Sequence, residues 1–326
     1  MTKHLKSLFI ALFAMAALVG CKDDDKGHPI QKANIYTELA KHSDLSIALQ
    51  AIDMAGLQSA FTKDNLTFFA PTDSAFSEHF ENLGVNNLTE LYNFYGAETF
   101  KNVILYHLLE KKVKGMDVIN SYIVTAAKNS NGNHMHAYIS SIDKNISLNA
   151  FAANVTKRDI EVDGSVIHKV DGVLSPLTLN GLIRVNPNFS KLRSAISKTQ
   201  DNLEAILNQE NQKYTIFGAD DAAMNAFLSS KGFTGWSDFT SANSTYDLSC
   251  LLKYHILGGE TKAANLQSKS YNTLYSGHEV EVVKKESGTL NILDEKGTFP
   301  VAGVKTTDII AINGAIHIID KVLEYN

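Results

Sequence analysis

Apolar residues recur at helical spacing in two matching stretches of the chain. In each stretch five positions fall at i, i+3, i+4, i+7 and i+8, which places them in one stripe on a helix. The stripes are Phe100, Val103, Ile104, His107 and Leu108 in the first stretch and Leu248, Leu251, Leu252, His255 and Ile256 in the second. We expect each stretch to form the longest helix of its half of the chain, with a histidine inside the apolar face.

Short apolar runs predict strands around these helices. Residues 67–70 form an apolar run closed by Pro71, and Thr72 or Asp73 can cap the helix that follows. Later in each half, runs typical of strands are bounded by turn-forming glycine and asparagine residues, as at 136–140 and 279–283. Each half has helices first and strands afterwards, which predicts an α+β domain.

The two halves repeat the same motifs at an offset of 148 or 149 residues. The repeated residues of the first half are Thr67, Asp73, Tyr106, His107, Asp159, His168 and Asp171; those of the second are Thr215, Asp221, Tyr254, His255, Asp308, His317 and Asp320. A period this long indicates tandem domains, because the repeats of a solenoid are several-fold shorter.

These motifs together resemble a fasciclin-like domain. They are Thr-Phe-Phe-Ala-Pro-Thr-Asp-Ser-Ala-Phe at 67–76, a Tyr-His pair after an apolar helix, and an Asp-Ile strand leading into Ile-His-x-x-Asp-x-Val-Leu. The resemblance covers residues 34–178 and 179–326, which we take as domains 1 and 2. It implies an α+β fold in which a twisted β-wedge carries helices packed on one side.

Each copy departs from the motif pattern at one place. The second copy has Gly218-Ala219-Asp220 in place of Ala-Pro-Thr. The first has Gly164-Ser165 where the second has the more typical Asn313-Gly314. Neither departure removes a residue that chemistry would need.

Residues 1–20 are typical of a signal peptide. A positive start at Lys3 and Lys6 precedes an apolar run at 8–17 that is too short to span a bilayer comfortably. The run ends in Leu-Val-Gly-Cys at 18–21, which resembles the lipobox of bacterial lipoproteins and makes Cys21 the predicted site of lipid attachment. An ordinary secretory signal followed by an incidental cysteine is the alternative.

Residues 21–33 are predicted to be a disordered tether, because the charged run at 22–27 has no apolar partner to bury. The run also resembles an acidic signal that sends lipoproteins to the cell surface in one large group of Gram-negative bacteria; a solvated spacer is the alternative. Several acyl chains on one cysteine would hold the protein on the outer membrane without spanning it. We expect it to face the cell exterior.

Composition narrows the possible partners. The net charge of −5 and the pI near 6.1 give no basic footprint for nucleic acid. A hydrophobic fraction of 44% suits two well-packed domains.

The chain has two cysteines. If Cys21 carries lipid, only Cys250 remains and no intrachain disulfide can form. We interpret Cys250 as a small buried hydrophobic residue rather than a nucleophile.

The repeated histidines invite a catalytic or metal-binding interpretation. His107 and His255 lie in apolar stripes, where a neutral imidazole can donate to a backbone carbonyl and accept from a nearby donor. We therefore interpret them as structural, and His168 and His317 likewise, because they lie in strands rich in isoleucine and valine.

Other candidate sites also have a structural interpretation. Asp73 and Asp221 suit helix capping, and the remaining repeated aspartates can satisfy backbone amides or a histidine. A carboxylate pair for glycoside hydrolysis is an alternative that needs a fixed separation. His134-x-His136 can bind a metal, but an exposed turn explains it equally well. Trp236 aligns with Leu88, which favours a core position over a sugar-stacking platform.

We find no glycine-rich phosphate loop, serine nucleophile elbow or Cys-Cys metal pair in the sequence. The sequence therefore predicts no catalytic residue, cofactor or metal. The favoured function is a non-enzymatic surface protein for interaction or adhesion that binds extracellular protein or polysaccharide, the role associated with the fasciclin resemblance. An accessory glycan-binding lipoprotein of a nutrient-uptake system is the alternative, and it would require an exposed aromatic cluster. Segments 110–135 and 257–276 differ most between the copies, so we expect a binding face there.

Overall fold

The computed structural model describes residues 33–143, 145–150, 152–241, 248–297 and 301–326. Residues 33–326 group as one compact unit. The predicted signal peptide, Cys21 and almost the whole predicted tether lie outside the described residues. Within the described ranges, every helix is too short or too polar to cross a bilayer.

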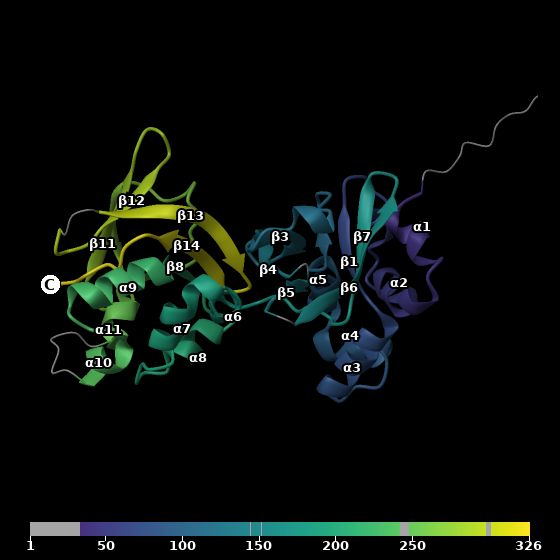
Figure 1. The fold of residues 1–326 in the computed structure, drawn as a ribbon, viewed down its shortest axis with the longest axis horizontal. Coiled ribbons are helices and arrows are strands. Elements are labelled where there is room, and N and C mark those ends of the chain that lie inside the picture. The colour runs from purple at the N-terminus through teal and green to yellow at the C-terminus, as the bar shows by residue number, and fades with distance from the viewer. Residues whose placement is uncertain (1–32, 144, 151, 242–247, 298–300) are drawn as a thin grey trace, which may run out of the picture. The chain divides into compact units, whose positions relative to one another are not determined.

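A seven-stranded sheet forms the centre of the first copy (Figure 1), in the order β2-β1-β7-β6-β5-β4-β3. Its strands are β1 (Thr67–Pro71), β2 (Leu108–Leu109), β3 (Ser121–Lys128), β4 (His134–Ile142), β5 (Asn145–Leu148), β6 (Ala153–Val162) and β7 (Ser165–Val170). Strands β1 and β7 run parallel and the other pairs run antiparallel. Because β2 also contacts β3, the sheet nearly closes on itself.

The second copy repeats this topology strand for strand, in the order β9-β8-β14-β13-β12-β11-β10. Its strands are β8 (Tyr214–Ala219), β9 (Ile256–Gly258), β10 (Lys269–Asn272), β11 (Glu279–Lys284), β12 (Leu290–Leu293), β13 (Ala302–Ala311) and β14 (Gly314–Ile319). The parallel pair is again the one that joins the first strand to the last. The duplication in sequence is thus a duplication of the whole sheet.

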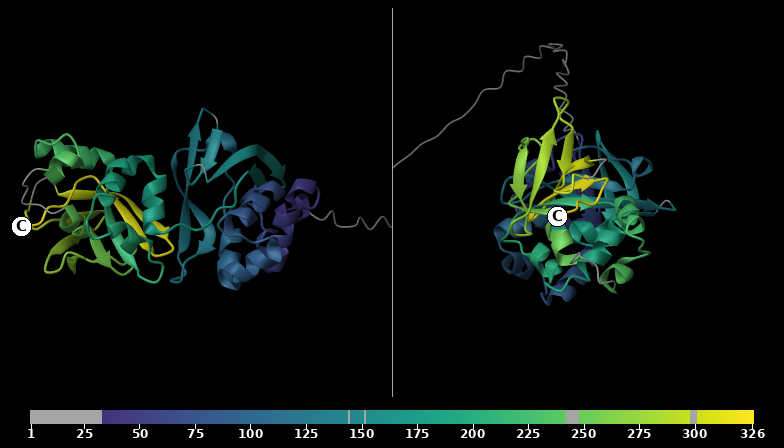
Figure 2. Two further views of the ribbon diagram at one scale, coloured as in Figure 1. Left: turned by 90° about the horizontal axis from the view of Figure 1, so that it is seen from below. Right: turned by 90° about the vertical axis from the view of Figure 1, so that its left-hand side faces the viewer.

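Helices pack along one side of each sheet, which gives the α+β fold that the sequence predicts. Figures 1 and 2 show this separation most clearly in the second copy. The first copy has α1 (Ile35–Leu39), α2 (Ser46–Met54), α3 (Asp73–Leu83), α4 (Leu88–Tyr95) and α5 (Ala97–Leu105). The second has α6 (Leu179–Val185), α7 (Ser190–Ile196), α8 (Leu203–Asn208), α9 (Asp221–Ser230), α10 (Trp236–Ser241) and α11 (Leu248–Lys253).

The two apolar stripes do not form the longest helices, so this prediction was wrong. Helix α5 ends at Leu105 and α11 at Lys253, whereas the longest helix of each copy, among the residues that the structure describes, is α3 or α9. The chain leaves the helix just before the histidine and enters a short strand, in which Leu108 pairs with Phe68. The apolar spacing continues because the strand faces the same core, not because the helix continues.

Side-chain caps explain where α3 and α9 begin. The Thr72 hydroxyl accepts a hydrogen bond from Ala75 N at 3.3 Å, and the Asp220 carboxylate accepts one from Ala223 N at 2.9 Å. Each of these residues follows the first strand of its copy, so the same order of strand, capping residue and helix occurs in both copies.

Replacing Thr72 with alanine should therefore lower the free energy of unfolding by about 1 kcal/mol, because Ala75 N loses its cap. Urea denaturation measures the change. Thr72→Ser keeps the hydroxyl and serves as the matched control. A serine variant as unstable as the alanine variant would mean that the methyl group, and not the cap, stabilises the protein.

Asn313, where the copies differ in sequence, ties helices to the sheet in the second copy. Its side-chain oxygen accepts from Leu179 N at 2.7 Å, and its amide donates to Leu207 O at 2.9 Å and Gln209 O at 3.1 Å. The residue is fully buried. The counterpart Gly164 has no side chain to make these bonds, so the second copy has a connection between sheet and helices that Gly164 cannot make in the first.

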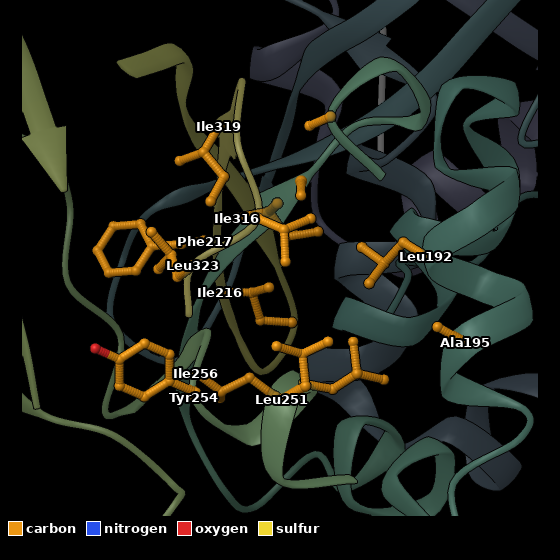
Figure 3. Close-up of a cluster of buried hydrophobic side chains, with 14 of the residues drawn as sticks. Leu192, Ala195, Ile216, Phe217, Leu251, Tyr254, Ile256, Ile316, Ile319 and Leu323 are labelled. Atoms are coloured by element: carbon orange, nitrogen blue, oxygen red, sulfur yellow. The ribbon is translucent and has the colours of Figure 1, made fainter. Parts of the chain in front are cut away.

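The core of the second copy is a continuous apolar cluster between sheet and helices (Figure 3), in which Phe217, Leu251 and Ile316 are fully buried. Trp236 belongs to this cluster; it is 3% exposed and its indole N–H donates to Lys191 O at 2.9 Å. Its alignment with Leu88 predicts this core position. Cys250 is half-buried and packs against the same cluster.

Hydrogen bonds also join the two copies. Asn129 donates to Glu260 at 2.7 Å and to Ala311 O at 3.1 Å, and Ile310 N donates to the Nδ1 atom of His136 at 3.1 Å. The interpretation of His134-x-His136 as an exposed turn was wrong, because both residues lie in β4 and are half-buried. Asn129 and Glu260 belong to the two divergent segments, so part of the expected binding face is used within the chain.

Candidate functional site

The repeated histidines close each domain by joining a helix end to the last segment of the copy. The Nδ1 atom of His107 donates to Val103 O at 2.8 Å, and its Nε2 atom accepts from Leu174 N at 2.8 Å. The backbone N–H of His107 bonds Ile104 O instead, so the ring takes the carbonyl that this N–H leaves free at the end of α5.

His255 repeats this arrangement with Leu251 O at 2.8 Å and Leu323 N at 2.9 Å. Both rings are buried. Burial lowers the pKa of His107 and of His255 to about 4, because a charged ring would lose its hydration. The rings are therefore neutral near neutral pH, and both nitrogens of each are occupied.

His168 and His317 form a second repeated contact with an aspartate backbone. The N–H of Asp159 donates to the Nδ1 atom of His168 at 3.1 Å, and the Nε2 atom of the ring donates to Val113 O at 2.9 Å. The Asp308–His317 pair matches it at 3.2 Å. Both aspartates have a φ near +60°, where β6 and β13 bulge.

The carboxylates of these aspartates bind the backbone of the loop that follows β2 in the first copy and β9 in the second. Asp159 accepts from Gly115 N at 2.8 Å and Asp308 from Ala263 N at 2.7 Å. Thr67 and Thr215 fasten the same loop, since each hydroxyl donates to one loop carbonyl and accepts from one loop N–H. The side chains of these repeated aspartates and threonines thus make their hydrogen bonds with backbone groups of the loop.

Asp73 and Asp221 cap a helix other than the one they begin. Asp73 accepts from Ile47 N and from the Ser46 hydroxyl, both at 2.8 Å, at the start of α2. Asp221 accepts from Lys191 N at 2.7 Å and the Ser190 hydroxyl at 2.6 Å, at the start of α7. The two aspartates thus cap helices, as expected, but they cap α2 and α7 rather than the helices that follow them. The sequence shows only the helix that follows, so it could not identify the helix that is capped.

The tyrosines of the Tyr-His pairs are buried and reach across the sheet. Tyr106 donates to His136 O at 2.6 Å, and Tyr254 donates to Glu279 O at 2.8 Å. Burial raises the pKa of both hydroxyls. Their ring and hydroxyl contacts hold strands, and neither hydroxyl opens onto a described cavity.

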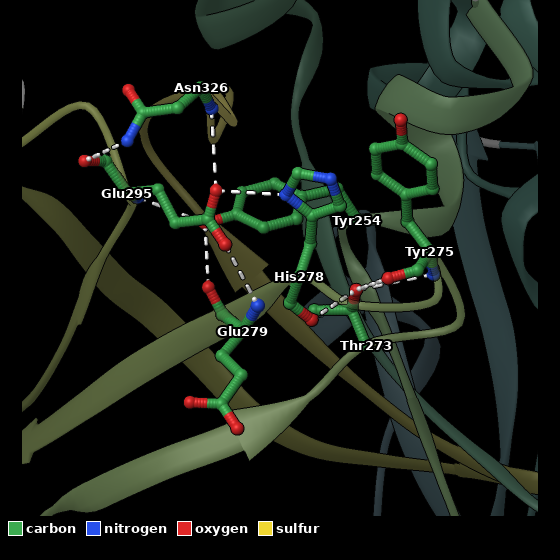
Figure 4. Close-up of polar contacts among 7 residues, drawn as sticks. All are labelled: Tyr254, Thr273, Tyr275, His278, Glu279, Glu295 and Asn326. Carbon is green, nitrogen blue, oxygen red and sulfur yellow. Dashed lines mark hydrogen bonds and ion pairs between the residues drawn. The ribbon is translucent and has the colours of Figure 1, made fainter.

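A polar cluster specific to the second copy surrounds Tyr254 (Figure 4). The ring of His278 stacks on Tyr275 with centroids 4.1 Å apart and bonds the Glu295 carboxylate at 2.9 Å. Burial opposes ionisation of Glu295, but hydrogen bonds from His278 and from two backbone N–H groups lower its pKa overall. One of those N–H groups belongs to Asn326, so the cluster fastens the end of the described chain.

One cleft recurs in both copies, beside α3 and α9. Asp171 lines the first cleft and Asp320 the second, and both are motif residues. Each aspartate also accepts a backbone N–H, from Asn154 at 2.6 Å or Gly303 at 2.7 Å. The other repeated motif residues lie away from these clefts.

The sequence singles out Asp171 but not the rest of this cleft, because three of its polar side chains come from the solvent-facing side of α3. Glu78, His79 and Asn82 have the spacing of any exposed helix face. Throughout the described ranges, no three His, Cys, Asp or Glu side chains gather closely enough to hold a metal ion. The cleft is thus a candidate binding site built from side chains that sequence alone does not distinguish.

Comparison with known proteins identifies the repeated unit. A model of the fasciclin domain matches residues 43–176 and 187–325. Human periostin is 25% identical over 266 residues, which cover 80% of this chain and 28% of periostin. The pig transforming growth factor-beta-induced protein ig-h3 is 26% identical over 262 residues, 79% of this chain and 34% of that protein. The chain thus spans about a third of the length of these relatives.

Among solved structures, a FAS1 domain pair from the insect cell adhesion molecule Fasciclin I is similar, with a TM-score of 0.48 and 16% identity. The match covers 89% of this chain and 95% of that chain.

Proposed function

Because the chain belongs to the fasciclin domain family, with two such domains in tandem, we propose that it is a non-enzymatic, membrane-anchored cell-surface protein that binds an extracellular protein or polysaccharide. Fasciclin domains occur in cell adhesion proteins, so a role in cell interaction is consistent with the family. The membrane anchor and the class of ligand are the parts that this proposal adds.

The observation that carries the proposal is the use of the repeated polar side chains. His107, His168 and their counterparts have both ring nitrogens bonded to backbone groups. A general base or a metal ligand needs a nitrogen free to meet its substrate or ion. The histidines repeated in both domains therefore support the fold, and this favours binding through surfaces over catalysis.

The anchor rests on the sequence alone. Cys21 follows a signal-like segment and precedes a charged run, so lipid on its thiol would hold the two domains outside the outer membrane on a tether. Two domains on one anchor can also gain avidity for a repetitive ligand such as a polysaccharide.

One cell-based experiment tests anchor and function together. Intact Gram-negative bacteria that express the full chain should adhere to immobilised polysaccharides or extracellular matrix proteins, and Cys21→Ala should abolish adhesion by releasing the protein from the membrane fraction. Cys250→Ala is the matched control, because it changes a cysteine without touching the anchor. Adhesion no greater than that of cells lacking the chain would contradict the proposal.

A further inference from the structure

The cleft of the first copy has a volume of about 260 Å³ and lies between α3 and the segment that follows β7. Its polar walls are formed by Glu78, His79, Asn82, Asn154 and Asp171. This volume is below the roughly 300–1,000 Å³ of pockets for drug-sized ligands. The cleft therefore suits one small polar unit of a longer ligand.

Two of these side chains are available to a ligand. The Glu78 carboxylate and the Asn82 amide lie one helical turn apart on α3, are exposed, and make no hydrogen bond or ion pair with another described residue. Asp171 and Asn154 are hydrogen-bonded to each other at the opposite wall. The cleft thus offers a free acceptor and a free amide opposite a wall fixed in position.

A row of rings leads from this cleft to the surface. The ring of His79 stacks on Tyr95 with centroids 6.1 Å apart, and its Nε2 atom shares a hydrogen bond of 2.8 Å with the Tyr95 hydroxyl. Tyr95 in turn meets the edge of Phe94 at 5.5 Å. Phe94 is 57% exposed, one of few large apolar side chains left in solvent among the described residues. Burial lowers the pKa of His79, so this ring is neutral near neutral pH.

The charges and hydrogen-bonding groups of the cleft indicate which class of ligand it can bind. Two carboxylates and a neutral histidine disfavour an anion, because no basic side chain lines the cleft. A sugar offers vicinal hydroxyls, which a carboxylate and an amide can bond together, and a C–H-rich ring face that packs on an aromatic ring. The free polar groups of the cleft, and the exposed ring of Phe94 that Tyr95 and His79 connect to it, match both features of a neutral sugar.

We propose that the cleft beside α3, together with the exposed ring of Phe94, binds a neutral oligosaccharide. One sugar unit occupies the cleft, where Glu78 and Asn82 bond its hydroxyls, and a following unit packs on Phe94. This inference rests on the proposed function and narrows its ligand to a neutral glycan in the first domain.

The equivalent cleft of the second copy has different side chains at the described positions on its helix. Ala226, Phe227 and Ser230 occupy the positions of Glu78, His79 and Asn82. At the same offset Ala242 aligns with Phe94 in sequence. The inference therefore assigns the sugar to the first domain alone.

The test measures binding of short neutral glucan, mannan, galactan and xylan oligosaccharides to the purified full-length chain by calorimetry, in a detergent without a sugar headgroup. We expect saturable binding of at least one oligosaccharide. Glu78→Gln and Phe94→Ala should each weaken it by about tenfold. Both side chains are exposed, so circular dichroism should show unchanged folding.

Two exposed positions outside the cleft serve as matched controls. Glu81→Gln changes an exposed carboxylate of α3 that does not line the cleft, and Ile142→Ala removes an exposed apolar side chain elsewhere. Both should bind as the parent chain does. Oligosaccharide binding unaffected by Glu78→Gln and Phe94→Ala would overturn the inference and leave the proposed function standing. Binding only to matrix proteins would also overturn the inference while supporting adhesion, and adhesion by neither route would overturn both.

Discussion

Replacing His107 with alanine should lower the free energy of unfolding by roughly 3–5 kcal/mol, which is a large fraction of the stability of a typical domain. The substitution leaves Val103 O and Leu174 N without their partner in a buried site. It also opens a cavity where the ring packed. His255→Ala should have a similar cost in the second domain, because its ring makes the same two contacts.

Hydrogen exchange can locate the effect within the chain. In His107→Ala the N–H of Leu174 should exchange faster, whereas the N–H of Leu323 should stay protected because His255 still binds it. His255→Ala should give the reverse pattern. Each domain thus serves as the internal control for the other.

His134→Ala is the external control, since that ring is half-buried and its one side-chain hydrogen bond within the described residues runs from Nδ1 to Thr125 O at 2.9 Å. It should cost about 1 kcal/mol. If His107→Ala lowers the free energy of unfolding no more than His134→Ala does, the structural interpretation of His107 is wrong. If the variant stays folded but no longer binds partners, the Tyr-His pair is a binding site.

Features that depend on local spacing could be predicted from the sequence. The offset of 148 residues predicted two equivalent units, and the two sheets share one strand order. The apolar strand before Thr72 and the turn at Gly132, whose φ is +76°, also follow from residue type alone. The strand and the turn could be predicted because each is decided by neighbours within a few residues, and the repeat because it is visible in the sequence itself.

Features that depend on distant partners could not be predicted. The end of α5 is decided by the pairing of Leu108 with Phe68, some forty positions earlier. Asp73 caps α2 because the fold brings the start of that helix beside it. The cleft at Glu78 exists only where α3 meets the segment after β7. In each case the residue type was visible, but its partner was supplied by the fold.

Acidifying the protein from pH 6.5 to pH 4.5 should lower its free energy of unfolding by roughly 2 kcal/mol for each of His107 and His255. Burial sets the pKa of His107 and of His255 at about 4 in the folded state, against 6.5 for an exposed ring. The unfolded chain therefore binds protons first as the pH falls. The contribution is fully present above pH 6.5 and is lost progressively as the pH falls toward 4.

Histidines dominate this window because the carboxylates with shifted pKa values respond at lower pH. The pKa of Glu161, for example, is lowered to about 2 by Lys112 and Lys114, so its contribution is lost only below the ordinary value of 4.5. Among the histidines that the structure describes, six have a lowered pKa: His79, His107, His136, His168, His255 and His317. Burial is the leading cause in all of them.

Urea denaturation at a series of pH values measures how the free energy of unfolding changes with pH. NMR titration of the ring C–H signals then shows which histidines cause the change. The rings of His107 and His255 should remain neutral well below pH 6.5 in the folded protein. Stability that stays flat between pH 6.5 and 4.5 would contradict the burial of neutral rings. The rings would then titrate in the folded state, with at least one nitrogen open to water, and the case for catalysis or ligand binding at the Tyr-His pairs would have to be reopened.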